Sequence, residues 1–180
     1  MKNNLSRIKS VSRFIRIIFV VIIVIIPITI SLYWIFYNNL PLPMKISAPN
    51  SSFIMEDLEP INRILCFAAG LIPIAVQIGI LVTLARLFHL YEKGEILSAR
   101  NVQCFKRLGQ LIIARAIAGI LYTPLISLAL SITNPPGQRQ LSLGLTSEII
   151  GTFLVGTVIL VVSWVMDEGR AINDEQKLVI

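Results

Sequence analysis

Four apolar stretches, each close to the roughly 20 residues that cross a bilayer as a helix, constrain this chain more than any other feature. Hydrophobic residues make up 55% of the chain and charged residues only 14%, against about 25% charged residues in soluble domains. The hydrocarbon of a bilayer offers no hydrogen-bond partner to backbone N–H and C=O groups, so stretches of this length are expected to be helices. The sequence therefore predicts an all-α polytopic membrane protein. Its four transmembrane helices are expected at about residues 17–37, 64–88, 108–130 and 149–166.

The rest of the chain is short connections, so we expect one membrane domain over residues 1–180. An outer linker is expected at 38–62, a loop at 89–107 and a tail at 167–180. These leave no room for a soluble catalytic domain. The sequence also shows no nucleophile paired with a base, no metal-ligand set and no phosphate-binding loop. We therefore expect no enzymatic activity, no cofactor and no metal.

The basic residues predict the orientation of the spans. Of the 16 lysines and arginines, twelve belong to the N-terminal tail, the middle loop and the C-terminal tail, while only Lys45, Arg63 and Arg139 belong to the other side. Cytoplasmic loops carry the excess of basic residues, so both termini and the middle loop are expected in the cytoplasm. The net charge is +6, and the basic residues border apolar spans. This placement fits contact with the lipid bilayer and its anionic headgroups better than direct nucleic-acid binding.

Two segments with similar turn chemistry follow the second and fourth spans. Gly94 and Gly169 suit the left-handed position that ends a helix, and Ser98 and Asn173 suit the cap that begins the next one. This similarity predicts a 2+2 arrangement of two helical hairpins. After Ser98 the chain is expected to run as a helix into the third span. The basic residues at its start are candidate contacts for a partner or for lipid: Arg100, Lys106 and Arg107.

Polar residues inside the spans are few. Arg115 is the only charge well inside a span, and Gln77 is the best polar candidate at mid-membrane. Arg115 is expected to snorkel to the cytoplasmic interface, to pair with a polar group between the helices, or to hold an anion or lipid headgroup. Gln77 is expected to hydrogen-bond between helices. Ala114 and Ala118 form a small-residue pair that suits close helix packing, and His89 is interpreted as an ordinary interfacial histidine.

Two stretches carry a resemblance to a known family: LARLFHLYEKGEILSARNVQCFKRLGQLIIA, residues 84–114, and VVSWVMDEGRAINDEQKLVI, residues 161–180. With the length and the four spans, they resemble the bacterial membrane proteins of the family DUF2975. The resemblance implies a four-helix protein of the bacterial inner membrane with no assigned biochemistry, and it carries over no catalytic residue. Members are often encoded beside a small helix-turn-helix regulator, which implies a candidate cytosolic partner.

Two classes of function stay open on the sequence. The first is a membrane anchor or sensor that holds a small cytosolic DNA-binding regulator at the basic middle loop and C-terminal tail. The second is a small transporter or channel subunit, which would need to form a homo-oligomer to enclose a path. The first is favoured because the loops are short and no acidic residue lies inside a span.

Overall fold

The computed structural model describes residues 2–41, 58–95, 98–135, 139 and 141–178. It contains four long helices: α1 (Lys2–Ile35), α2 (Pro60–Lys93), α3 (Ala99–Ser131) and α4 (Ser147–Leu178), with a short 3-10 turn, η1 (Tyr37–Asn39), after α1. Within the described residues there is no strand. Each of the four helices is long and apolar enough to cross a membrane. The predicted all-α, four-span fold is confirmed, and the chain is a multi-pass membrane protein.

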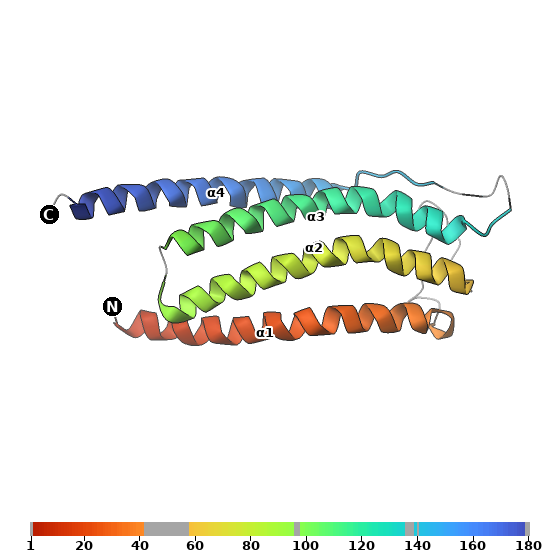
Figure 1. Ribbon diagram of the computed structural model, residues 1–180, viewed down its shortest axis with the longest axis horizontal. Coiled ribbons are helices and arrows are strands. Elements are labelled where there is room, and N and C mark those ends of the chain that lie inside the picture. The colour runs from red at the N-terminus through yellow and green to blue at the C-terminus, as the bar shows by residue number, and fades with distance from the viewer. Residues whose placement is uncertain (1, 42–57, 96–97, 136–138, 140, 179–180) are drawn as a thin grey trace.

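The four helices form an open row in chain order (Figure 1). α1 packs on α2, α2 on α3 and α3 on α4, and other contacts among the described elements are marginal. The row therefore leaves α1 and α4 as edge helices with exposed apolar side chains, such as Val24 and Ile28 on α1 and Leu154 and Val158 on α4. Such faces would favour aggregation in water, whereas lipid tails solvate them.

The helices are longer than the predicted spans. α2 continues to Lys93, into the predicted loop 89–107, whereas α3 begins at Ala99 and confirms the helix expected to run from Ser98 into the third span. The first helix ends slightly early, at Ile35, and α2 begins at Pro60, where a proline has no intrahelical hydrogen bond to lose. Hydropathy marks only the lipid-facing core of a helix, so polar helical turns outside that core are missed. Most of the predicted outer linker, residues 42–57, lies outside the described residues.

The turn between α2 and α3 has the predicted chemistry. Gly94 adopts φ +86°, and its N–H donates to the carbonyl of Tyr91 at 3.0 Å. The hydroxyl of Ser98 accepts a hydrogen bond from the N–H of Asn101 at 3.3 Å. The Asn101 side chain also donates to the carbonyl of Glu95 at 2.6 Å. These bonds satisfy backbone groups that two helix ends leave without partners.

The predicted second copy of this turn is wrong. α4 runs without a break through Gly169 and Asn173 to Leu178, and Gly94 is the one glycine with positive φ in the described chain. At Gly94 the chain reverses and α3 packs on α2. At Gly169 no side chain lies within 4 Å of the position that a Cβ would occupy, so no packing partner requires a reversal there. Helical glycine costs about 1 kcal/mol relative to alanine, less than the hydrogen bonds that a break would remove. The turns therefore do not support the 2+2 repeat.

Two glycines bring α3 and α4 into backbone contact. A Cβ added to Gly109 of α3 would lie 2.9 Å from the backbone nitrogen of Leu160. A Cβ added to Gly156 of α4 would lie 2.9 Å from the backbone nitrogen of Ile113. Small residues at membrane helix interfaces permit this approach, which dispersion contacts then stabilise.

The end of the row opposite the α2–α3 turn holds an aromatic core, which we call the aromatic end. The rings of Trp34 and Tyr37 stack at 5.6 Å, and Tyr37 has no exposed surface. These rings pack with Leu58, Cys66, Ile126, Ala129 and Leu130. Beside this core the buried Asn62 side chain donates to the Leu130 carbonyl at 3.3 Å and the Thr133 hydroxyl at 2.9 Å. The aromatic end thus joins the end of α1 to α2 and α3.

Candidate functional site

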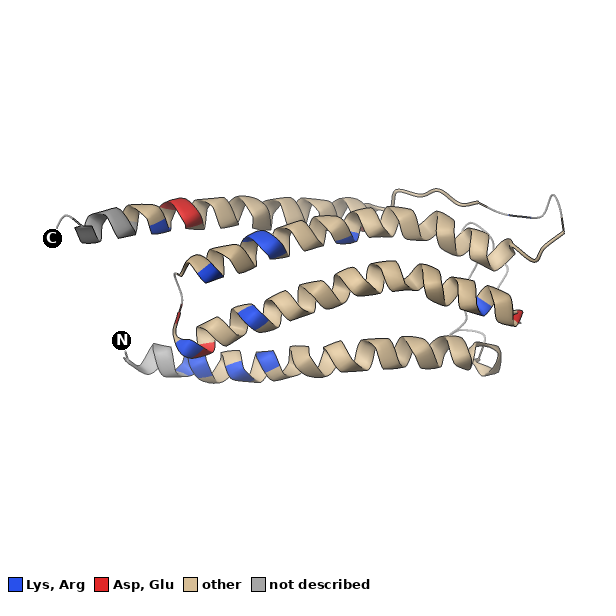
Figure 2. Ribbon diagram, in the orientation of Figure 1, with Lys and Arg blue, Asp and Glu red and all other residues tan. Residues whose placement is uncertain are grey.

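Positive charges gather at the end of the row that contains the α2–α3 turn (Figure 2). We call this the basic end, and both chain termini lie there as well (Figure 1). Its described basic residues are Arg7, Lys9, Arg13, Arg16, Arg86, Lys93, Arg100, Lys106, Arg107 and Arg170. The fold therefore brings the three basic segments of the sequence to one end.

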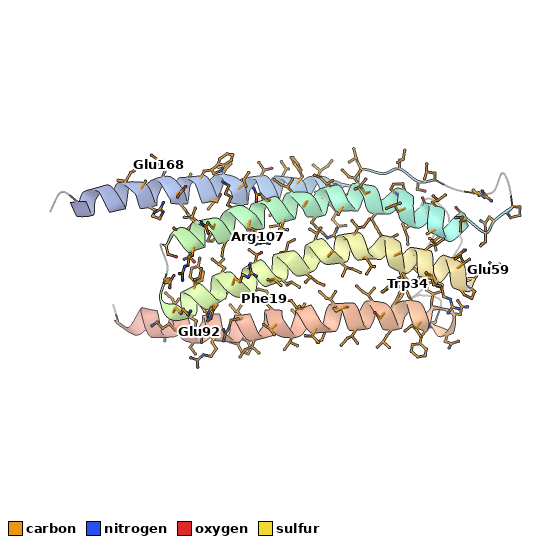
Figure 3. The ribbon with its side chains drawn as sticks, viewed as in Figure 1. Phe19, Trp34, Glu59, Glu92, Arg107 and Glu168 are labelled. Carbon is orange, nitrogen blue, oxygen red and sulfur yellow. The ribbon has the colours of Figure 1, made fainter. Side chains whose placement is uncertain are left out.

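One acidic residue at the basic end fastens α1 to α2. Glu92 of α2 accepts a hydrogen bond from Arg13 Nε at 2.7 Å and lies 3.3 Å from Arg16 Nη2 (Figure 3). The other terminal nitrogen of Arg16 donates to Nδ1 of His89 at 2.8 Å. A guanidinium can only donate, so Nδ1 of His89 is the acceptor. His89 was interpreted from the sequence as an ordinary interfacial histidine, and the packing of α1 supplies the partners that the sequence did not reveal.

A second set of charges surrounds a cavity of about 330 Å³ between α2 and α3. Arg86 and Lys93 from α2 and Arg100 and Arg107 from α3 line this cavity, which we call the basic pocket. Arg100 lies 4.0 Å from Glu95; the Arg100 side chain is exposed and the Glu95 side chain is partly exposed. In the described part of the chain, no carboxylate pairs with Arg86, Lys93 or Arg107. Four cations around one hollow can bind an anionic group, because guanidinium groups chelate carboxylates and phosphates.

The basic pocket divides the candidate residues that the sequence pointed to. Arg100 and Arg107 both line the basic pocket, and Arg107 lies on the α2 side of α3 (Figure 3). Lys106 is exposed and does not line the pocket. Val102 and Leu108 of α3 are buried. Sequence reasoning missed Arg86 and Lys93 as members of the site. Their signal was their position just before the reversal at Gly94, which returns the chain alongside them.

Gln77 and Arg115 come together near the middle of the row. Both line two adjoining cavities of about 500 Å³ each, one reaching α4 and the other reaching α1. Nη1 of Arg115 lies 3.8 Å from the position that a Cβ on Gly119 would occupy, one turn closer to the aromatic end. The side chain therefore runs away from the basic end, opposite to the direction expected for snorkelling. Arg115 forms no hydrogen bond or ion pair with another described residue.

α4 begins beside the middle of α3 (Figure 1). Ile149, in its first turn, lies 3.5 Å from the position of a Cβ on Gly119, and the Ser142 N–H donates to the Ser127 hydroxyl at 3.0 Å. The non-helical residues 141–146 thus run along the half of α3 nearer the aromatic end. The Thr146 hydroxyl accepts the Ile149 N–H at 3.3 Å and caps α4. A capped helix start and the carboxylate of Glu148 therefore lie beside the same cavity as Arg115.

No group of three or more His, Cys, Asp and Glu side chains suited to a metal lies among the described residues. Searches of curated proteins and of solved structures give no match to the chain. The family model for a protein of unknown function (DUF2975) matches residues 37–180, which is most of the chain. The matched part includes α2, α3 and α4 with both the basic pocket and the cavity-lining residues Gln77 and Arg115. The chain therefore belongs to the DUF2975 family of proteins of unknown function.

Proposed function

We propose that this protein is a bacterial inner-membrane anchor or sensor that holds a small cytosolic DNA-binding regulator at its basic end. The proposal places both termini and the α2–α3 turn in the cytoplasm, in keeping with the excess of basic residues there. It includes no enzymatic activity and no direct contact with nucleic acid. The observation that carries it is the basic pocket, in which Arg86, Lys93 and Arg107 have no carboxylate partner among the described residues.

The charges at the basic end have two different uses. Arg13 and Arg16 share the carboxylate of Glu92 and hold α1 in place. The cations of the basic pocket are left available to an outside anion. An acidic surface on a cytosolic protein is such an anion, and complementary charge speeds its association and selects it over other partners. α4 extends past the start of α3 (Figure 1), and its exposed Ile172 offers an additional apolar contact.

Photocrosslinking in living cells tests this proposal. A photoreactive amino acid replaces Gln103, an exposed residue that lines the basic pocket, or Ile172, and mass spectrometry identifies the captured proteins. We expect capture of a soluble DNA-binding protein. Arg86→Glu combined with Arg107→Glu is expected to reduce that capture by about tenfold or more, since each charge-assisted contact contributes about 1.5–3 kcal/mol.

Lys106→Glu is the matched control, because Lys106 neighbours Arg107 in the sequence and lies outside the basic pocket. It is expected to leave capture within about twofold of the unmodified chain. Equal loss of capture in Lys106→Glu and Arg107→Glu variants would show that general charge, and not the basic pocket, holds the partner. Unchanged capture in both would remove the basis of the proposal.

A second candidate function is a small transporter or channel subunit that acts as a homo-oligomer. The helices of one chain form an open row and enclose no path, so this function needs several copies. The polar cavity around Gln77 and Arg115 favours it, because that cavity would line a path between copies. The same crosslinking experiment separates the two functions. Capture of copies of this chain, with no soluble partner, would support the oligomeric subunit and contradict the anchor.

A further inference from the structure

We propose that the two adjoining cavities at the middle of the row form one binding site for a single-chain amphiphile with a carboxylate headgroup, such as a long-chain fatty acid. The two cavities share Gln77, Arg115 and Tyr122. We call the joined space the central groove. This inference is independent of the anchor proposal, because the central groove lies away from the basic pocket and shares no lining residue with it.

The part of the central groove that reaches α4 is polar. Arg115 and Gln77 face the start of α4, where Thr146, Glu148 and Thr152 complete the wall. The Thr152 hydroxyl donates to the Glu148 carbonyl at 2.8 Å and the Thr123 hydroxyl to the Gly119 carbonyl at 3.3 Å. Those hydroxyl protons are therefore engaged within their own helices. The donors left for a ligand are the Arg115 guanidinium, the Gln77 amide and the hydroxyls of Tyr122 and Thr146.

The part of the central groove that reaches α1 is apolar. Ile26, Ile30, Tyr33 and Trp34 of α1 line it, and Gly70, Pro73 and Ile74 of α2 lie across from them. Trp34 is 7% exposed and keeps its place by stacking on Tyr37. The apolar chain of a bound amphiphile would pack against these apolar side chains, while the headgroup of the same molecule reached Arg115.

Charge determines the headgroup. Arg115 and Glu148 are the charged side chains that line the central groove, and no ion pair within 4.0 Å joins them. An arginine at membrane depth is costly unless an anion pairs with it, and a carboxylate matches its planar fork of donors. Glu148 on the opposite wall repels a doubly charged phosphate more strongly than a singly charged carboxylate. The geometry thus favours a monoanionic carboxylate.

Trp34 provides a fluorescent reporter for the test. The chain has two tryptophans, and Trp164→Phe removes the exposed one on α4. The protein is purified in nanodiscs of neutral phosphatidylcholine and titrated with a fatty acid that carries bromine on its chain, because bromine quenches tryptophan at short range. We expect saturable quenching of Trp34 by the brominated acid, reversed by the unbrominated acid, and much weaker quenching by the brominated methyl ester.

Arg115→Gln is expected to weaken binding of the acid by about tenfold or more, while Lys106→Gln, on the same helix outside both the central groove and the basic pocket, leaves it unchanged. Competition by the unbrominated acid needs no variant, so the test stands even where Arg115→Gln does not fold. Quenching that rises without saturation and equally for acid and ester would overturn the proposal. Equal binding by folded Arg115→Gln protein and the unmodified chain would overturn it as well.

Discussion

Replacing Gly156 by leucine is expected to lower the free energy of unfolding by about 3 kcal/mol, because the added side chain has no space to occupy. A Cβ at this position lies 2.9 Å from both the backbone nitrogen and Cγ1 of Ile113. Backbone atoms of a packed helix cannot rotate away, so α4 has to separate from α3. α4 packs on no other helix beyond marginal contacts, so this separation should free it from the row. Chemical unfolding in mild detergent measures the effect.

Gly151→Leu is the matched control on the same helix. No atom lies within 4 Å of the position that its Cβ would occupy, so the variant should keep or slightly raise the stability through the better helix propensity of leucine. Equal losses in both variants would contradict the close approach of α3 and α4 at Gly156, because position 151 has space for a side chain and position 156 does not.

Replacing Tyr37 by alanine is expected to lower the free energy of unfolding by about 3–5 kcal/mol, the cost of removing a large aromatic ring from a packed core. Tyr37 is fully buried against Trp34, whose ring it stacks on at 5.6 Å, and it joins the end of α1 to Cys66 on α2 and Leu130 on α3. The loss should be accompanied by a change in Trp34 fluorescence, because the stacking partner is gone. Unfolding followed by the fluorescence of the Trp164→Phe chain measures both.

Tyr37→Phe retains the ring and removes only the hydroxyl. The packing contacts of the ring should therefore remain, and most of the free energy of unfolding should be kept. A Tyr37→Ala loss below about 1 kcal/mol would contradict a structural role of the aromatic end in holding α1. It would leave the ion pairs of Glu92 at the basic end as the main attachment of α1.

The four helices and one turn could be predicted because their signals are local. Twenty apolar residues in sequence mark a span wherever they pack, and Gly94 followed by Ser98 describes a helix end and a helix start. The same local chemistry at Gly169 gave a wrong prediction, because a cap-compatible sequence also tolerates a continuous helix. Only a packing partner on the far side of the turn forces the chain to reverse there.

The candidate sites depend on how neighbouring helices align, which no local pattern specifies. The sequence grouped Arg100, Lys106 and Arg107 as candidate contacts, yet it did not show that Arg107 lines a pocket with Arg86 of α2 while Lys106 does not. Small-residue spacing pointed to Ala114 and Ala118, whereas the backbones approach at Gly109 and Gly156, on two different helices. The direction of the Arg115 side chain likewise follows from the start of α4 beside Gly119.

The most direct test of the account asks which side of the membrane the basic end faces. In a chain with Cys66→Ala and Cys104→Ala, single cysteines replace exposed Ser10 or Lys93 at the basic end, or exposed Arg139 beyond the other end of the spans. Membrane-impermeant maleimide is applied to intact spheroplasts and to inverted inner-membrane vesicles. We predict labelling at position 139 in spheroplasts, and at positions 10 and 93 only in inverted vesicles. Labelling of position 10 or 93 in intact spheroplasts would place the basic pocket outside the cytoplasm and contradict the proposed function.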